Sequence, residues 1–371
     1  MTDQTKNKKE FKNRCYGILI IKSENSNFNA DFTGNARRLP DDNGTIYATD
    51  KALKYSIRRF WVDQGKDVFV WRSHIPNGNV RTRDQRMAFM KEKLIENNNN
   101  KDLKLLIKAK KWFEGLGSTK KEDDVKNKNI DYDIKKYKDE LLMNSDKKIE
   151  DRIKNKIAEL KKIITATVFA KSIDTKLFGV TYTGEGPLSL TGPVQISYGI
   201  NKLTENVNYT NDILSPYPTD DKGTTQSSIG KENKTLDSYY VYDFSINPQN
   251  IISHYNSSKD IIDVMKLTDE DIESLKEALK NSVTALDTTS KKDSENVMLL
   301  FIKMPENSKQ FLPAMKNLVE ITKNKNEEVE IDISKIKELI DTKDDKIEVE
   351  LYSNDKTIKF KTIDGWNNEG L

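Results

Sequence analysis

Four short apolar runs, separated by long polar stretches, constrain the fold of this chain most. The runs are "CYGILII" (15–21), "VQISYGI" (194–200), "SYYVYDFSI" (238–246) and "VMLLFIK" (297–303). Each combines β-branched and aromatic residues in a pattern that is typical of a buried or half-buried strand. The sequence therefore predicts a sheet whose strands lie far apart along the chain.

Two amphipathic helices are expected between these strands. The first covers 49–63, and the second begins at Thr268, whose spacing from Asp271 resembles a capping box. Apolar side chains at helical spacing form the buried stripes. These are Leu53, Ile57, Phe60 and Trp61 in the first helix, and Ile272, Leu275 and Leu279 in the second.

The order of the elements is strand, helix, strand, strand, helix, strand. This order predicts an α+β fold of the ferredoxin-like or RRM-like βαββαβ type. The expected core comprises residues 14–62, 165–200 and 238–303. Within it, the β-branched and aromatic composition of 165–182 indicates extended structure.

Three further segments interrupt or follow this core. Residues 63–164 are predicted to be a charged helical insertion that opens with a strand at "KDVFVWR" (66–72). Residues 201–237, rich in Asn, Thr, Ser, Pro and Gly, are expected to form a hairpin-like excursion. Residues 304–371 are expected to form an α/β extension that packs on the core.

Composition narrows the class of function. The 371 residues include 62 Lys and Arg against 59 Asp and Glu, a net charge of +3, so any polyanion site must come from local clustering. Cys15 is the only cysteine, which excludes an intrachain disulfide and a cysteine-based zinc site. With no apolar signal segment and no membrane-spanning run, we expect a soluble, cytoplasmic protein.

Common catalytic motifs are absent from the sequence. His74 and His254 are the only histidines, and neither lies in a metal-binding motif. The stretch "GTTQSSIGKE" (223–232) has the wrong spacing for a phosphate-binding P-loop, and Glu232 occupies the Ser or Thr position. We therefore expect no cofactor and no metal, while the two histidines leave Ser-His-Asp catalysis open even though no G-x-S-x-G elbow appears.

Basic residues are more informative. Arginine is scarce in this lysine-rich chain, yet it concentrates between residues 37 and 86, and its planar fork suits phosphate. The arginines of this stretch outside the first helix are Arg37, Arg38, Arg72, Arg81, Arg83 and Arg86. In the first helix, Lys51, Lys54 and Arg58 form a basic stripe. The cluster favours polyanion binding, although any single member is more often plain solvated surface.

The strand at 194–200 has a small polar face. Strict alternation places Gln195, Ser197 and Gly199 on the side opposite Val194 and Ile196. An RRM-like sheet leaves one face open for RNA, and the polar face fits either that role or a solvated surface. Since the RRM stacking signature is absent, contacts to the nucleic-acid backbone are the better expectation.

Several collinear segments together resemble one family. They are "TDKALKYSIRRFW", "VRTRDQRM", "FAKSIDTKLFGVTYTGEGPLSLTGPVQISYGINKL", "SSIGKENKTLDSYYVYDFSINP" and "LTDEDIESLKEALKNSV". They resemble the Cas7 backbone protein of type I CRISPR effector complexes, closest to the subtype I-B (Csh2) branch. The family commonly has Asn-Pro-Asn-Gly-Asp in the first loop, where this chain has "NFNAD" (27–31).

The resemblance implies a hand-shaped, non-catalytic subunit that polymerises along CRISPR RNA in antiviral defence. The βαββαβ core would be the palm, 63–164 the fingers, and 201–237 the thumb that reaches toward a neighbouring copy. Implied partners are the CRISPR RNA, the target DNA strand paired with it, and the other Cascade subunits (Cas5, Cas6, Cas8-like and the small subunit). The expected RNA-binding residues are Arg37, Arg38, Lys51, Lys54, Arg58, Arg81, Arg83, Gly192, Gln195, Ser197 and Lys231.

Two alternatives remain. Backbone subunits of type III complexes cut target RNA with an Asp in the loop after the first strand, and Asp31 lies in about that place. The more ordinary role for Asp31 is to cap a turn in this Asn-rich loop. A single-strand RNA binder that acts alone is the other alternative, but its stacking motif is missing.

Overall fold

The computed structural model describes residues 9–98, 104, 107–111, 147–203, 207–218, 227–251, 259–288, 290–324, 328–343, 346–354, 359–360, 366 and 368–370. Two compact units make up the chain. Unit 1 comprises residues 1–66, 193–248 and 267–371. Unit 2 comprises residues 67–192 and 249–266, so 165–192 belongs with the helical insertion and not with the sheet of unit 1.

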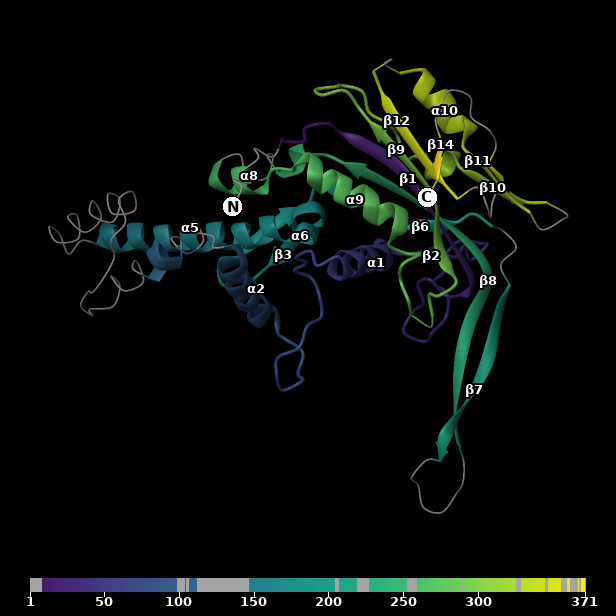
Figure 1. Ribbon diagram of the computed structural model, residues 1–371, viewed down its shortest axis with the longest axis horizontal. Helices are drawn as coiled ribbons and strands as arrows, with labels where there is room; N and C mark the ends of the chain where they lie inside the picture. Colours follow the sequence, from purple (N-terminus) through teal and green to yellow (C-terminus); the bar gives the residue numbers. More distant parts are fainter. Residues whose placement is uncertain are drawn as a thin grey trace, which may run out of the picture. The chain divides into compact units, whose positions relative to one another are not determined.

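Unit 1 is built on an antiparallel sheet (Figure 1). Its central strand β1 (Cys15–Ser26) pairs antiparallel with β8 (Ser227–Ile246) on one side and β9 (Ser294–Lys303) on the other. The short strands β5 (Val194–Ile196) and β6 (Gly199–Asn201) pair with β8. At the edges, β2 (Tyr47–Ala48) follows β6, while β12 (Glu348–Ser353) and β14 (Asn368–Gly370) follow β9.

Both expected helices are confirmed. Helix α1 (Asp50–Asp63) begins after Thr49, whose hydroxyl accepts from the Ala52 amide, and α9 (Asp269–Asn281) begins with the full capping box of Thr268 and Asp271. The two helices pack on each other, and the indole of Trp61 donates to the Ser274 carbonyl at 3.1 Å. Helix α9 also packs against β9, so this pair covers one face of the sheet.

The opposite face of the sheet is covered as well. Tyr16, Ile18 and Ile20 of β1 share a buried cluster with side chains from the C-terminal part of the chain, such as Met315 and Ile336. That part contributes η1 (Met315–Leu318), β10 (Glu320–Lys323), β11 (Val329–Asp332), α10 (Ser334–Asp341) and β13 (Lys359–Phe360). The expectation of an open face is therefore wrong for this sheet, because the extension supplies enough apolar side chains to bury it.

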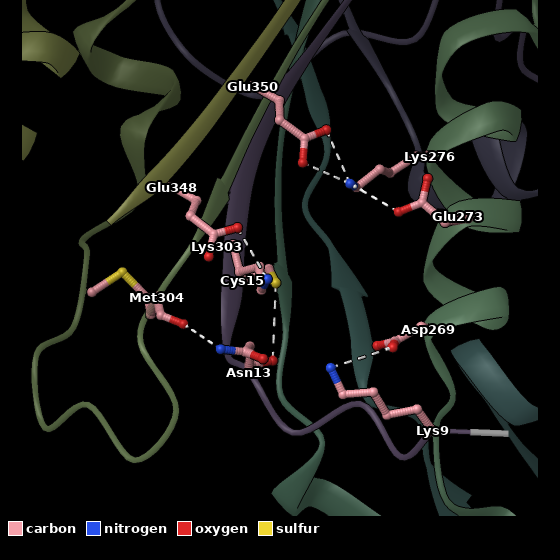
Figure 2. A network of polar contacts seen from close by, with 10 residues as sticks. All are labelled: Lys9, Asn13, Cys15, Asp269, Glu273, Lys276, Lys303, Met304, Glu348 and Glu350. Atoms are coloured by element: carbon pink, nitrogen blue, oxygen red, sulfur yellow. Dashed lines mark hydrogen bonds and ion pairs between the residues drawn. The ribbon is translucent and has the colours of Figure 1, made fainter. Parts of the chain in front are cut away.

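A polar network ties α9 to strand β12 of the sheet (Figure 2). The Lys276 ammonium lies between Glu350 of β12, at 2.7 Å, and Glu273 of α9, at 3.1 Å. Nearby, Cys15 is fully buried, and burial raises the pKa of its thiol to about 12. The network therefore bridges α9 and β12 beside a protected, unreactive thiol.

Two buried residues fix the geometry of the central strands. Gly17 faces the Phe244 ring, and a Cβ at this position would lie 2.3 Å from Phe244 Cζ and 2.4 Å from the Leu300 carbonyl oxygen. Asn296 joins β9 to the end of α9: its Oδ1 accepts from the Val283 amide at 2.9 Å, and its Nδ2 donates to the Leu279 carbonyl at 2.7 Å. Neither position tolerates another side chain easily.

A long hairpin extends from the sheet within unit 1. Strand β7 (Asn208–Pro218) pairs antiparallel with the outer part of β8, and the two strands run together beyond the other strands (Figure 1). The hairpin expected within 201–237 is confirmed, although residues 204–206 and 219–226 lie outside the described residues. Strand β8 is thus much longer than the strand predicted at 238–246. The apolar pattern did not reveal its outer half, because that half is polar.

Unit 2 is mainly helical. It contains α2 (Arg83–Asn98), α5 (Lys147–Lys171), α6 (Ile173–Phe178) and α8 (Lys259–Met265), with a two-stranded sheet of β3 (Gly179–Tyr182) and β4 (Leu188–Thr191). Residues 165–178 are therefore helical and not extended as expected. Burial in the apolar cluster of this unit outweighs the weak helix propensity of their β-branched residues.

The strand expected at 66–72 is not formed. The amides of Phe69 and Val70 donate to the Asp174 carboxylate at 2.7 and 3.0 Å. The Arg86 guanidinium donates to the Phe69 carbonyl at 3.2 Å and also to the Val68 carbonyl. Side chains thus satisfy the backbone groups that a neighbouring strand would otherwise pair.

Candidate nucleic-acid interface

The loop after β1 is ordered by its own polar side chains. The side-chain Nδ2 of Asn27 donates to the carbonyls of Gly34, at 3.0 Å, and Asn233, at 3.2 Å. The Asn29 Oδ1 accepts from both the amide and the hydroxyl of Thr49, each at 2.8 Å, which connects the loop to the start of α1. Asn27 and Asn29 thus hold the loop against α1 and the hairpin.

Asp31 closes a tight turn at the tip of this loop. Its Oδ1 accepts from the Thr33 hydroxyl at 2.6 Å, the Thr33 amide at 2.8 Å and the Asn35 amide at 3.0 Å. These bonds, led by the Thr33 hydroxyl, lower the pKa of the exposed Asp31 carboxyl. Asp31 therefore has the turn-capping role, and the turn presents Phe32 with 98% of its surface exposed.

The loop tip is fastened to the hairpin. The Asn233 side chain donates to Asn35 Oδ1 at 2.7 Å, and the Thr235 hydroxyl donates to Asn27 Oδ1 at 3.3 Å. Since alternate residues of a strand share a face, Lys231 lies on the same side, about 7 Å beyond Asn233. Residues 27–38, Lys231 and Asn233 together form what we call the loop–hairpin surface.

The predicted basic residues near this surface differ in their availability. Arg38 and Lys51 are exposed, and Arg38 donates to the Gly44 carbonyl at 2.7 Å. Arg37 is half-buried and donates to the Ala30 carbonyl at 3.2 Å. Lys54 pairs with Asp50 at 2.9 Å with only 14% of its side chain exposed. Arg58, on the same helix, is half-buried.

The polar strand face does not follow simple alternation. Strand β5 ends at Ile196 and β6 begins at Gly199, and the pairing of β6 with β8 is shifted by one residue relative to that of β5. A Cβ at Gly199 would meet the ring of Tyr242, whereas Ser197 contacts Asp243 on the other face. The expectation that Ser197 and Gly199 share a face is wrong, because the shift acts as a β-bulge.

Ser197 belongs to a polar cluster with the C-terminal extension. Its hydroxyl accepts from the Asp243 amide at 3.1 Å, and the Lys316 ammonium lies 3.4 Å from it. Asp243 accepts from the Met315 amide at 2.5 Å, but burial dominates and raises the pKa of its carboxyl. Gln195 is exposed on β5.

The remaining predicted residues lie in unit 2. The space beside Gly192 is filled by backbone, since a Cβ there would lie 2.2 Å from the Phe178 carbonyl carbon and 2.3 Å from the Gly179 nitrogen. Arg81 donates to the His74 carbonyl and lies 4.3 Å from the Phe89 ring centroid. Arg83 donates to the Thr183 hydroxyl and lies 5.3 Å from the Tyr182 ring centroid. These three residues therefore make internal contacts of unit 2.

Sequence reasoning missed three residues at these positions. Phe32 could have been noticed as an aromatic inside a polar turn sequence, "ADFTGN". Asn233 and Lys316 reach the site only through strand pairing and the packing of the C-terminal extension, and no local pattern indicates either contact.

Neither a metal-binding cluster nor a membrane-spanning helix is found among the described residues. No group of three or more His, Cys, Asp or Glu side chains in that part of the chain is placed to hold a metal ion. Within the same residues, no helix is both long enough and apolar enough to cross a bilayer.

Comparison with known proteins identifies the family. No curated protein sequence matches the chain. Among solved structures, it is similar to "CRISPR RNA-guided surveillance complex, pre-nicking", with 12% identity, a TM-score of 0.48, and coverage of 94% of this chain and 96% of that one. A second structure, "CRISPR RNA-guided surveillance complex", has 9% identity, a TM-score of 0.42 and 94% coverage of each chain. A family profile described as "CRISPR-associated protein Cas7" matches residues 13–349, so the chain belongs to the Cas7 family.

Proposed function

We propose that this chain is the guide-RNA-binding backbone subunit of a type I CRISPR effector complex, of the I-B branch. In this proposal, copies polymerise along the CRISPR RNA, and sequence is recognised by base pairing between the guide and target DNA. The main support for the proposal is that the Cas7 family profile matches residues 13–349. The other subunits of the complex would bind at the ends and along the side of this polymer.

The palm of the hand would be the ferredoxin-like core of unit 1. The strand order β9-β1-β8-β6, with all three neighbouring pairs antiparallel, supports this assignment. Unit 2 would supply the fingers, and the hairpin of β7 and β8 would be the thumb that reaches toward the neighbouring copy.

RNA would lie along the loop–hairpin surface and the adjacent side of α1. Arg38, Lys51 and Lys231 are exposed there and offer charged donors to phosphate oxygens. The covered sheet face favours this route, since the extension from residue 304 onward occupies the face on which RRM-like domains bind RNA. Arg37, Lys54 and Arg58 are half-buried, so they would support this surface from its inner side.

The role that we propose for Asp31 is structural. One of its oxygens already accepts three hydrogen bonds that hold the turn, which favours a scaffold over an RNA-cleaving subunit. Incubation with complementary RNA and Mg²⁺ tests this point. Fragments at regular spacing that vanish in Asp31→Asn would instead support the cleaving alternative.

The salt dependence of RNA binding tests the proposed surface. Replacing Arg38, Lys51 and Lys231 by Ala should weaken binding to RNA of any sequence and reduce the slope of log K against log salt by about two, at roughly 0.7 per single-strand phosphate contact. A control with the same loss of charge replaces Lys9, Lys12 and Lys335, which lie elsewhere in unit 1 with 85%, 52% and 58% of their side chains exposed. Equal slopes for the two triple variants would exclude the surface.

A further inference from the structure

Phe32 is the most exposed large hydrophobic side chain among the described residues, with 98% of its surface in solvent. For comparison, the exposed Phe311 retains 61%, and its ring lies 4.9 Å from the Arg14 guanidinium carbon. An aromatic ring left uncovered gains no stabilisation from burial, and its face is available for contact with a partner.

The exposure of Phe32 is fixed by the surrounding turn. Asp31 holds Thr33 and Asn35 on the far side of Phe32, and Asn27 holds the carbonyl of Gly34. Gly34 has a φ of +85°, a conformation that glycine adopts without strain. The ring is therefore presented outward by a network of hydrogen bonds that spans both sides of it.

The chemistry around Phe32 favours a nucleobase over a protein surface. Docking of a protein normally requires a contiguous apolar patch, and the residues of this turn other than Phe32 are Asp, Thr, Gly and Asn. A base, in contrast, offers a flat π face that a single aromatic ring can cover. Exposed Arg38 and Lys231, on the same loop–hairpin surface, supply the positive charge that a nucleic-acid strand requires.

We propose that Phe32 is a base-stacking residue: its ring covers one base of the bound RNA while the loop–hairpin surface holds the flanking phosphates. This inference rests on the proposed RNA-binding function. The stacking is tolerant of sequence, because every base has a π face. Phe32 would thus provide the aromatic contact to a base that, in RRM domains, comes from a sequence motif absent from this chain.

Two substitutions separate stacking from hydrophobic docking. Phe32→Leu keeps an apolar side chain without a π face, and Phe32→Trp keeps the π face. We expect Phe32→Leu to weaken binding to a labelled 30-nucleotide RNA of mixed sequence by about tenfold, within the 5- to 150-fold range of one stacked base. Phe32→Trp should bind as tightly as the wild type, and its added fluorescence should be quenched by RNA. Phe311→Leu is the matched control and should change nothing.

The outcomes distinguish this inference from the proposed function. If the wild type does not bind RNA, the proposed function fails and the inference fails with it. If the wild type binds RNA and Phe32→Leu binds equally well, only the stacking inference is overturned. Loss of self-association in Phe32→Asp, with RNA affinity unchanged in Phe32→Leu, would assign the ring to a protein contact. Phe32→Leu alters no charge, so the slope of log K against log salt for this variant should equal that of the wild type.

Discussion

Replacement of Gly17 by Ala should open the centre of the sheet. The added Cβ would lie 2.3 Å from Phe244 Cζ and 2.4 Å from the Leu300 carbonyl oxygen, where ordinary contacts are 3.4 Å or longer. The Phe244 ring is buried and the Leu300 oxygen is part of the paired backbone of β9, so neither can move aside without shifting its neighbours. Overpacking costs about 1–3 kcal/mol. Because this clash is with backbone, Gly17→Ala should lower the free energy of unfolding by about 2–3 kcal/mol.

The single cysteine makes this loss measurable. Cys15 lies two residues from Gly17 on β1, is fully buried, and has a pKa raised to about 12, so it reacts with a thiol reagent only when the strand opens. When closing is fast, the labelling rate follows the open fraction. A loss of about 2–3 kcal/mol therefore predicts labelling that is roughly 30 to 150 times faster at neutral pH, at about 1.4 kcal/mol per factor of ten.

Gly230→Ala is the matched control for Gly17→Ala. It makes the same substitution in β8, on the hairpin, where the nearest atom to the added Cβ would be 3.8 Å away. Its labelling rate should equal that of the wild type. Should Gly17→Ala also label within twofold of the wild type, the inference that β1 and its neighbours are packed without spare volume at this point would be refuted.

Two further predictions concern buried polar groups of unit 1. Asn296→Ala removes the acceptor for the Val283 and Thr284 amides and the donor to the Leu279 carbonyl. At about 1–3 kcal/mol per unpaired buried group, it should lower the urea midpoint clearly. Asn281→Ala removes only a solvent-exposed side-chain hydrogen bond to the Glu277 carbonyl and should leave the midpoint unchanged. Asp243 has a pKa raised above its ordinary 3.8 by burial, so its ionisation opposes folding; any stabilisation from Asp243→Asn should be greatest at neutral pH and should decline as the pH falls through the raised pKa toward 3.8. A constant difference between Asp243→Asn and the wild type across that range would contradict the raised pKa.

The elements of the sheet and its two helices could be predicted from sequence because their signals are local. Apolar runs mark β1 and β9, and Thr49 and Thr268 mark helix starts through hydrogen bonds within four residues. The strand expected at 66–72 failed because the partner of its amides is a side chain about 100 residues away, Asp174. No local pattern carries that information.

Only part of the candidate site could be predicted from sequence, because the rest depends on contacts between residues that are distant in the chain. The basic residues are visible as letters, but their availability depends on neighbours such as Asp50, which pairs with Lys54. The face of Gly199 depends on a one-residue shift against β8, which only the paired strand reveals. Which face of the sheet is covered depends on the side on which the C-terminal elements pack. Their amphipathic pattern indicates that one side of each is buried, but not against which surface.

Strand β8 continues from the hairpin into the middle of the sheet as one element of 20 residues, a length of about 65 Å at roughly 3.3 Å per residue. Its inner half is paired with β1 from Thr235 to Ile246. A pull along the hairpin is therefore borne in shear, by many inter-strand hydrogen bonds loaded at once, and not by bonds that separate one after another. If the hairpin links copies along a strand of RNA, this geometry makes the sheet of each copy a mechanical anchor for the next.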